Sequence, residues 1–273
     1  MGDSKKRKHS KAFYGNFSKK SKSKNVGQLD NGMIGFLVTC SDREKICMSE
    51  MLNILTRYAE EMYGVEGQED RVVDGEEKKG AVDDISRTLE NELAELKRTR
   101  ERGRFQMVCS LTRNVVFIQC SEEINPVDLT YKILTDIQTK GDLIVRYAQR
   151  LLPVSLVCRA SIDDIKRTAP SLLERHFHGT KSKSMSYAVA YKARNNSELK
   201  RDEVISVVAA LVDGDGSFGH KVNLTSPELV VVVEVVKKHC LMSVVRDYHN
   251  LKKYNMHSIV EEKTEKKEEK ASK

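Results

Sequence analysis

The residues best suited to do chemistry lie in one short basic stretch of the C-terminal half of the chain. They stand between a strand-like segment and a helix-like one, and they are Lys192, Arg194, Asn195, Asn196, Lys200 and Arg201. An arginine offers a planar fork of donors that fits phosphate, an asparagine amide donates and accepts, and free backbone N–H groups at a helix start attract anions. The stretch is therefore typical of a site for a phosphate backbone or an exposed base. The same residues would also suit an exposed charged turn whose asparagines only cap the helix.

Two further arginines are embedded in the preceding strand-like segment. Arg146 and Arg150 lie in residues 143–153, where their charge and position make them candidates for the same surface. From residue chemistry alone, RNA and DNA remain equivalent ligands for these cations, because both present phosphates.

A glycine-rich segment, Gly214–Gly219, matches the spacing G-x-G-x-x-G. A dinucleotide site needs that turn after a strand and before a helix, whereas here it follows a helix-like segment and precedes a strand-like one. An EF-hand loop that starts at Asp213 would have Phe218 at its glycine position and Leu224 at its final glutamate position. We therefore predict a flexible turn and not a nucleotide or calcium site.

Cysteine and histidine spacing gives no sign of a metal site. The six cysteines contain no C-x-x-C pair, and neither His176 with His178 nor His239 with Cys240 has a second ligand pair at a zinc spacing. No Walker sequence and no G-x-S-x-G is present, although a triad assembled from distant residues would leave no such mark. We expect no catalytic residue, no metal and no cofactor in this chain.

The net charge of +7 over 273 residues is unevenly distributed. Residues 1–24 carry nine Lys and Arg against one acid, residues 25–143 carry 15 against 23, and residues 144–260 carry 18 against 11. Basic surfaces usually meet phosphate or acidic protein. The C-terminal half is therefore the better candidate for a nucleic-acid surface.

Composition also limits the compartment. No apolar run approaches the ~20 residues of a membrane span, and the first 25 residues lack the apolar core of a signal peptide. Scattered cysteines are typical of reduced thiols. We expect a protein of the nucleus, in particular the nucleolus, with the cytoplasm as an additional location; the cluster Lys5–Lys8 fits nuclear import or only a solvated tail.

The N-terminal half reads as strand, helix, hairpin, helix, strand. An apolar strand at 33–40 precedes a helix with a capping-box pattern at Ser41–Glu44, and a hairpin at 105–120 precedes a helix capped by Asn125. An acidic loop near 64–80 and a helix over 85–96 separate the two halves of this unit. The order suits a small α+β sandwich of ferredoxin-like type.

The C-terminal half has a second α/β rhythm. A strand over 143–153 comes before a helix over 161–177, which Ser161–Asp164 caps and which is kinked or split at Pro170. A half-buried strand near 185–191 follows. A helix over 204–212 and three strands follow, at 222–224, 229–236 and 240–246. The valine-rich strand is apolar on both faces, which predicts a sheet covered on both sides.

Several of these segments resemble the THUMP domain of RNA-modifying proteins. The likeness is carried by Tyr187–Asn196, by Lys221–Pro227 with its N-L-T-x-P pattern, and by Val230–Val236. Further segments are similar to the stand-alone THUMP adaptors of eukaryotic tRNA cytidine acetylation. These are Gly35–Cys40, Glu61–Gly64, Asn114–Ile118, Leu151–Val154, Ser243–Tyr248 and Lys253–Asn255.

The resemblance implies a domain plan. We expect a disordered basic tail over 1–28, a ferredoxin-like domain over 29–142, a THUMP domain over 143–257 and a disordered charged tail over 258–273.

The resemblance also implies a function. The adaptor would bind the tRNA acceptor end with its 3′ CCA and present serine and leucine tRNAs to an RNA cytidine acetyltransferase, which makes N4-acetylcytidine in the D arm. Acetyl-CoA and ATP would belong to that partner. Lys192, Arg194, Asn195 and Asn196 carry the family motif; the other candidates are chosen by charge. The alternatives are a cryptic tRNA-modifying enzyme and a general nuclear RNA-binding or interaction protein.

Overall fold

The computed structural model describes residues 29–65, 103–141, 145–179, 184–214, 216 and 218–271. The predicted basic tail over 1–28, most of the acidic loop near 64–80 and the predicted helix over 85–96 lie outside these residues. Within them, no helix has both the length and the apolar character needed to cross a membrane.

The first unit is a four-stranded antiparallel sheet with the strand order β2-β3-β1-β4 and two helices. Its elements follow the predicted order of strand, helix, hairpin, helix and strand. They are β1 (Gly35–Cys40), α1 (Glu44–Tyr63), β2 (Phe105–Thr112), β3 (Val115–Cys120), α3 (Pro126–Lys140) and β4 (Ala148–Val154). The prediction of a mixed α/β protein is confirmed.

The two helix starts of this unit have different origins. Asn125 caps α3 as predicted, because its side-chain oxygen accepts hydrogen bonds from the backbone N–H groups of Val127 and Asp128. The capping box predicted at Ser41 is wrong. Helix α1 begins after Arg43, which has a φ of 53° and makes no side-chain cap bond. The carboxylate of Glu44 instead accepts the N–H of Asn114 in the β2–β3 turn, at 2.8 Å.

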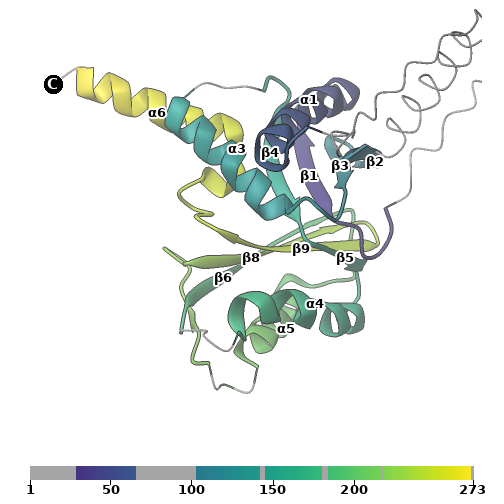
Figure 1. The fold of residues 1–273 in the computed structure, drawn as a ribbon. Coiled ribbons are helices and arrows are strands. Elements are labelled where there is room, and N and C mark those ends of the chain that lie inside the picture. Colours follow the sequence, from purple (N-terminus) through teal and green to yellow (C-terminus); the bar gives the residue numbers. More distant parts are fainter. Residues whose placement is uncertain are drawn as a thin grey trace, which may run out of the picture.

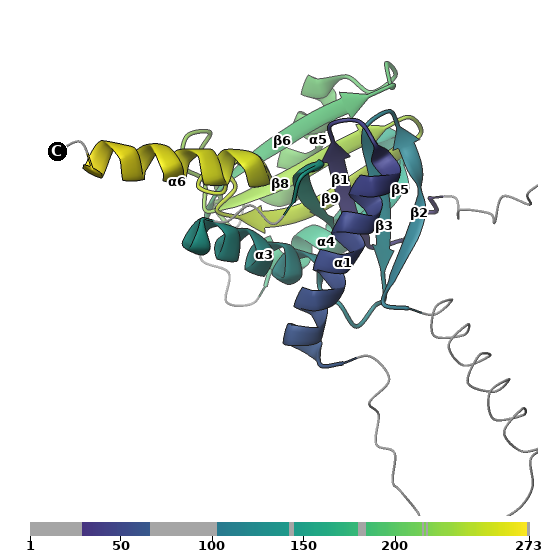
Figure 2. The same cartoon turned by 90° about the horizontal axis from the view of Figure 1, so that it is seen from above.

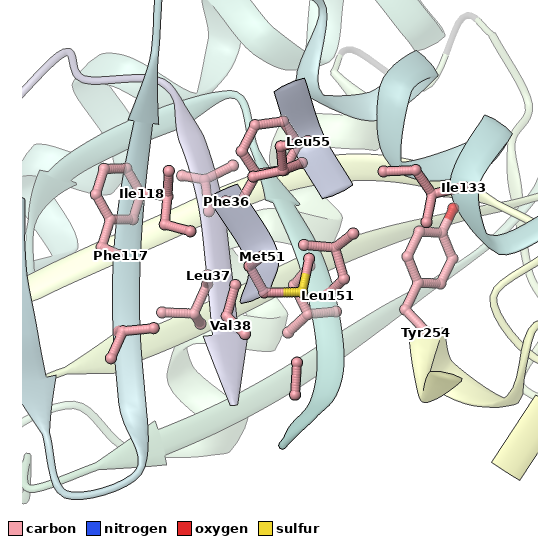
Figure 3. Packing of buried hydrophobic residues seen from close by; sticks show 14 of the residues in the cluster. Phe36, Leu37, Val38, Met51, Leu55, Phe117, Ile118, Ile133, Leu151 and Tyr254 are labelled. Carbon is pink, nitrogen blue, oxygen red and sulfur yellow. The ribbon is translucent and has the colours of Figure 1, made fainter. Parts of the chain in front are cut away.

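The core of the first unit lies between its sheet and its helices. Every residue of β1 is buried, so this strand is covered on both faces. Figure 3 shows Phe36 and Val38 near Met51 and Leu55 of α1, with Ile133 of α3 and Leu151 of β4 nearby. Because side chains alternate between the two faces of a strand, the residues of β1 pack into a buried layer on each side of the sheet.

The second unit is a five-stranded sheet with the strand order β5-β9-β8-β6-β7. Strands β8 and β6 run parallel, and β9 is antiparallel to both β8 and β5. The strands are β5 (Leu156–Arg159), β6 (Ser186–Arg194), β7 (Lys221–Val222), β8 (Leu229–Val236) and β9 (His239–Arg246). All of β8 after Leu229 is buried, which confirms the predicted two-sided cover.

Two helices, α4 (Ile162–Phe177) and α5 (Arg201–Asp213), cover one face of this sheet. Ser161 caps α4 through a bond from the N–H of Asp164 to its hydroxyl oxygen, at 3.2 Å. Pro170 lies inside a single continuous helix, so the predicted split does not occur.

The opposite face of the second sheet meets the first unit. Ala188, Val230 and Val245 belong to the same buried cluster as the core of the first sheet. Figure 1 shows the resulting layers, with the first unit on one side of β6, β8 and β9 and with α4 and α5 on the other. Strand β4 pairs with β1, so the segment predicted at 143–153 belongs to the first sheet, although the predicted boundary placed it after residue 142.

The C-terminal residues form a helix. A short turn, η1 (Lys252–Tyr254), leads into α6 (Met256–Ala271) where a disordered tail was predicted from residue 258. Met256 and Ile259 are buried and anchor its first turn. Figure 2 shows α6 extending beyond the sheets beside α3. The prediction of a disordered tail rested on the charged Glu and Lys residues and missed this apolar anchor.

Candidate nucleic-acid interface

A groove with a volume of about 420 Å³ brings together four of the chain's basic side chains. Its basic lining consists of Arg150 from β4, Lys192 from β6, Arg201 from the start of α5 and Lys253 from η1. We call this the basic groove. His249, Tyr191 and Leu224 also line it, so that cations, an exposed imidazole and an apolar side chain share one surface. Phosphates and bases need this combination, because cations bind the backbone and rings stack with bases. The Tyr191 ring itself packs against the core beneath α4 and α5, and its hydroxyl donates to the carbonyl of Leu199 at 3.0 Å.

A buried carboxylate lies at the floor of the basic groove. Glu234 of β8 is 3% exposed, and it forms ion pairs with Arg194 of the neighbouring strand and with Arg150 of the other sheet, the latter at 3.8 Å. Burying a charge is unfavourable unless it is paired. The two arginines therefore stabilise the buried carboxylate of Glu234, and the guanidinium of Arg194 is engaged in this ion pair.

Lys192 lies opposite Glu234 in the β6–β8 register, and its side chain is partly exposed. Partial burial lowers the pKa of Lys192, and the nearby Arg194 and Arg150 lower it further against the opposing effect of Glu234. An anion bound in the groove would raise the pKa of Lys192 and so oppose the effect of these two positive charges. Lys192 is thus the motif residue best placed to gain from a bound phosphate.

The two asparagines build the turn between β6 and α5. Asn195 has a φ of 52° and donates to the hydroxyl of Thr112 in β2 at 2.8 Å. Asn196 accepts from the N–H groups of Glu198 and Leu199 and donates to the carbonyl of Lys237 at 2.8 Å. Asn196 therefore closes the turn before α5 with both its amide oxygen and its amide nitrogen. It does not cap the helix, because the N-cap of α5 is Lys200, which makes no side-chain cap bond.

A left-handed backbone segment places Lys253 in the groove. Lys252, Lys253 and Tyr254 all have φ between 50° and 62°, a region that residues other than glycine rarely adopt. Arg150 holds this segment by donating to the carbonyl of Lys253 at 2.7 and 3.0 Å and to the Tyr248 hydroxyl at 3.0 Å. Tyr254, the last residue of this segment, is fully buried, and burial raises the pKa of its hydroxyl.

Comparison with known proteins shows which family this chain is related to. A THUMP domain matches residues 159–245, which run from the end of β5 almost to the end of β9. THUMP domain-containing protein 1 of Mus musculus is 37% identical over 235 residues, covering 85% of this chain and 66% of that protein. Its homolog in Drosophila melanogaster is 34% identical over 245 residues, covering 84% of this chain and 74% of the fly protein. This chain belongs to the THUMP domain-containing protein 1 family.

A less similar relative is named for a reaction on tRNA. The protein named tRNA acetyltransferase TAN1 of Saccharomyces cerevisiae is 28% identical over 267 residues, covering 90% of this chain and 91% of the yeast protein. Relatives of the THUMP domain-containing protein 1 family therefore include a protein named for tRNA modification.

In this THUMP protein the predicted site residues divide into three groups. Lys192, Arg201 and Arg150 line the basic groove. Arg194, Asn195 and Asn196 are engaged in the ion pair and the turn beside it. Lys200 and Arg146 lie apart from the groove lining. Lys200 stands exposed just before α5, while the N–H of Arg146 donates to Glu50 and its guanidinium lies 5.6 Å from the Tyr147 ring.

Sequence reasoning missed Lys253, His249 and Glu234. Lys253 belongs to a segment that carries the family resemblance, and this was the one signal that could have identified it. Glu234 interrupts a valine run, and only the fold shows that this interruption is a paired charge.

The described ranges contain no group of three or more His, Cys, Asp or Glu side chains that could hold a metal ion. Five cysteines with described side chains are buried free thiols. These observations agree with the sequence-based reading of the cysteines as packed, unpaired residues.

Proposed function

We propose that this protein is a non-catalytic tRNA-binding adaptor for an RNA cytidine acetyltransferase. It would present serine and leucine tRNAs so that the partner forms N4-acetylcytidine in the D arm. Holding the tRNA on the complex raises the effective concentration of the target cytidine, which is how a binding protein without chemistry of its own accelerates a reaction.

The basic groove is the observation that carries this proposal. Lys192, Arg201, Arg150 and Lys253 converge there from both sheets, and only Glu234 opposes them in the lining. Contacts of Lys and Arg with phosphate give salt-sensitive affinity with little sequence selectivity. The choice of cytidine would then come from the geometry of the complex and from the acetyltransferase.

The family supports tRNA as the ligand. A THUMP domain, a relative named for tRNA acetylation and a groove of cations and rings agree on RNA modification. We extend this to the acceptor end and its 3′ CCA, for which the exposed His249 would supply a ring. The first unit would assist as a ferredoxin-like domain, a proposal that its strand order supports.

The binding part of the proposal is tested by removing two groove cations. The double variant Lys192→Ala with Arg201→Ala should weaken binding of a serine tRNA transcript about tenfold and flatten the salt dependence. A matched control, Lys166→Ala with Arg175→Ala, removes two exposed cations from α4 and should bind normally. Equal affinity of the groove variant and the control would refute the groove as the site.

The adaptor part is tested by turnover. The purified protein, supplied with tRNA, acetyl-CoA and ATP, should form no N4-acetylcytidine until the acetyltransferase is added. Formation of the product by this protein alone would show it to be an enzyme, as the name of the yeast relative suggests for that protein.

The cellular role is tested by nucleoside mass spectrometry. Cells that lack the protein should lose N4-acetylcytidine from serine and leucine tRNAs, and the groove variant should not restore it. We propose the nucleus, in particular the nucleolus, as its place of action, which imaging of the tagged protein checks.

A further inference from the structure

A second basic pocket lies at the far edge of the THUMP sheet. It has a volume of about 340 Å³ and is lined by Arg159 at the end of β5, Lys238 in the β8–β9 turn and His239 at the start of β9, together with residues 29–31. None of these lines the basic groove. Arg159 and His239 are cross-strand partners, so the ladder itself brings the two side chains together.

The cations of this pocket are unpaired. Among the described residues, neither Arg159 nor Lys238 takes part in an ion pair, and both are exposed. Asp30 is the single acid in the lining. With His239 neutral, the lining therefore has a formal charge of +1, which matches the single negative charge of a phosphodiester.

His239 distinguishes this pocket from an ordinary charged surface. The rings of His178, His220 and His257 each bind a backbone carbonyl. In the part of the chain that the structure describes, the Nδ1 atom of His239 is buried without a hydrogen-bond partner. Buried polar atoms nearly always have partners, and no hydrogen bond at Nδ1 fixes this ring, so it can turn to present an N–H to a ligand in the pocket.

The pocket adjoins the turn that carries the motif asparagines. Asn196 donates to the carbonyl of Lys237, and the N–H of Lys237 donates to the carbonyl of Arg194. Lys238 follows directly. Since neighbouring strands lie about 4.8 Å apart, the ends of β6, β8, β9 and β5 span about 14 Å, a short distance for one RNA strand to cross.

We propose that this pocket, formed by Arg159, Lys238 and His239, binds a phosphodiester group of RNA. It forms a second contact for a tRNA whose backbone crosses the β8–β9 turn from the basic groove. The inference rests on the proposed function, because it assigns a further phosphate of the same ligand. The cations hold the phosphate, and the imidazole adds an N–H donor.

The test compares Arg159→Ala with Lys238→Ala as a double variant against the control Lys166→Ala with Arg175→Ala, which has the same net charge. Binding of a serine tRNA transcript is titrated between 50 and 200 mM salt. We expect the pocket variant to bind about five- to tenfold more weakly, with a salt slope smaller by about one, the value for one lost phosphate contact. The His239 ring signal in NMR spectra should shift when tRNA is added to the unchanged protein.

The outcomes separate this inference from the proposed function. If the unchanged protein binds tRNA and the groove variant weakens it, but the pocket variant matches the control, the pocket is not a phosphate site. A weaker pocket variant with an unaltered salt slope and an unmoved His239 signal would show a structural effect and would also overturn the inference. A protein that binds no tRNA would overturn both.

Discussion

Glu234 is the residue on which the candidate site depends most. Its buried carboxylate neutralises Arg194 within the sheet and Arg150 from the other sheet, and Arg150 in turn holds the carbonyl of Lys253. One acid therefore fixes two strands and a turn. A buried ion pair adds little stability in itself. Removing one partner is costly, because it leaves the other charges unpaired in the protein interior, where water cannot solvate them.

We predict that Glu234→Ala lowers the free energy of unfolding by about 3 kcal/mol, the range found when a buried ion pair loses one partner. The matched change Glu198→Ala removes an exposed acid and should alter it by less than about 0.5 kcal/mol. Urea denaturation of the three proteins measures both effects. Equal midpoints for Glu234→Ala and Glu198→Ala would show that the buried network is dispensable.

His176 should make stability depend on pH. Burial, and then the nearby Arg175, lower its pKa below the usual histidine value of about 6.5. Below pH 6.5 the unfolded chain binds a proton that the native state resists, so the native state loses stability as pH falls through this range. We expect a loss of at most about 1.4 kcal/mol per pH unit for this one proton.

The measurement is urea denaturation at pH 7.5, 6.5 and 5.5 for the unchanged protein and for His176→Asn. The free energy of unfolding of the variant should fall less steeply as the pH falls. The part of the decline that persists would come from groups such as His239, because burial lowers its pKa as well. A decline of the same slope in both proteins would remove His176 as the cause.

At the scale of elements, the η1 turn shows how backbone conformation places a cation. Lys252 and Lys253 have almost the same left-handed φ, yet Lys253 lines the basic groove while Lys252 forms an ion pair with Glu262 of α6. Glycine adopts this conformation without strain. Substitution by glycine therefore removes each side chain while keeping the turn.

We predict that Lys253→Gly weakens tRNA binding about three- to tenfold, as expected for a lost phosphate contact, while Lys252→Gly leaves it unchanged. Both variants should unfold within about 1 kcal/mol of the unchanged protein, since glycine relieves backbone strain. Filter binding and thermal unfolding provide the two readouts. Equal tRNA affinities for the two variants would show that Lys253 does not contact RNA.

The sequence predicted those elements that local chemistry determines. Asn125 and Ser161 cap their helices as expected, because an Ncap needs only its own side chain and the next turn. The prediction at Ser41 failed because Glu44 serves a distant hairpin turn instead. Arg150, chosen from its charge and position, lines the basic groove. Its bond to Lys253 could not be predicted, since no local pattern encodes a contact across 103 residues.

At the scale of the whole molecule, position matters more than net charge. The basic N-terminal stretch and the acidic middle account for most of the charge asymmetry, yet the groove draws its cations from β4, β6, α5 and η1. Two sheets that share one buried cluster hold these elements in a fixed relation. The groove is therefore a product of how the units pack, and neither unit alone contains it.

This packing yields a prediction about truncation. A chain of residues 29–264 retains Leu29, Ile259 and the first turns of α6, all of which belong to or border the shared core. It should bind serine tRNA within about threefold of the full chain at 150 mM salt, where charges beyond ~8 Å are largely screened. A chain of residues 29–257 loses Ile259, which is 2% exposed, and should be less stable by about 2 kcal/mol, the value of one buried aliphatic side chain. Loss of tRNA binding by the 29–264 chain, with its unfolding midpoint unchanged, would move the RNA site from the groove to the charged ends of the protein.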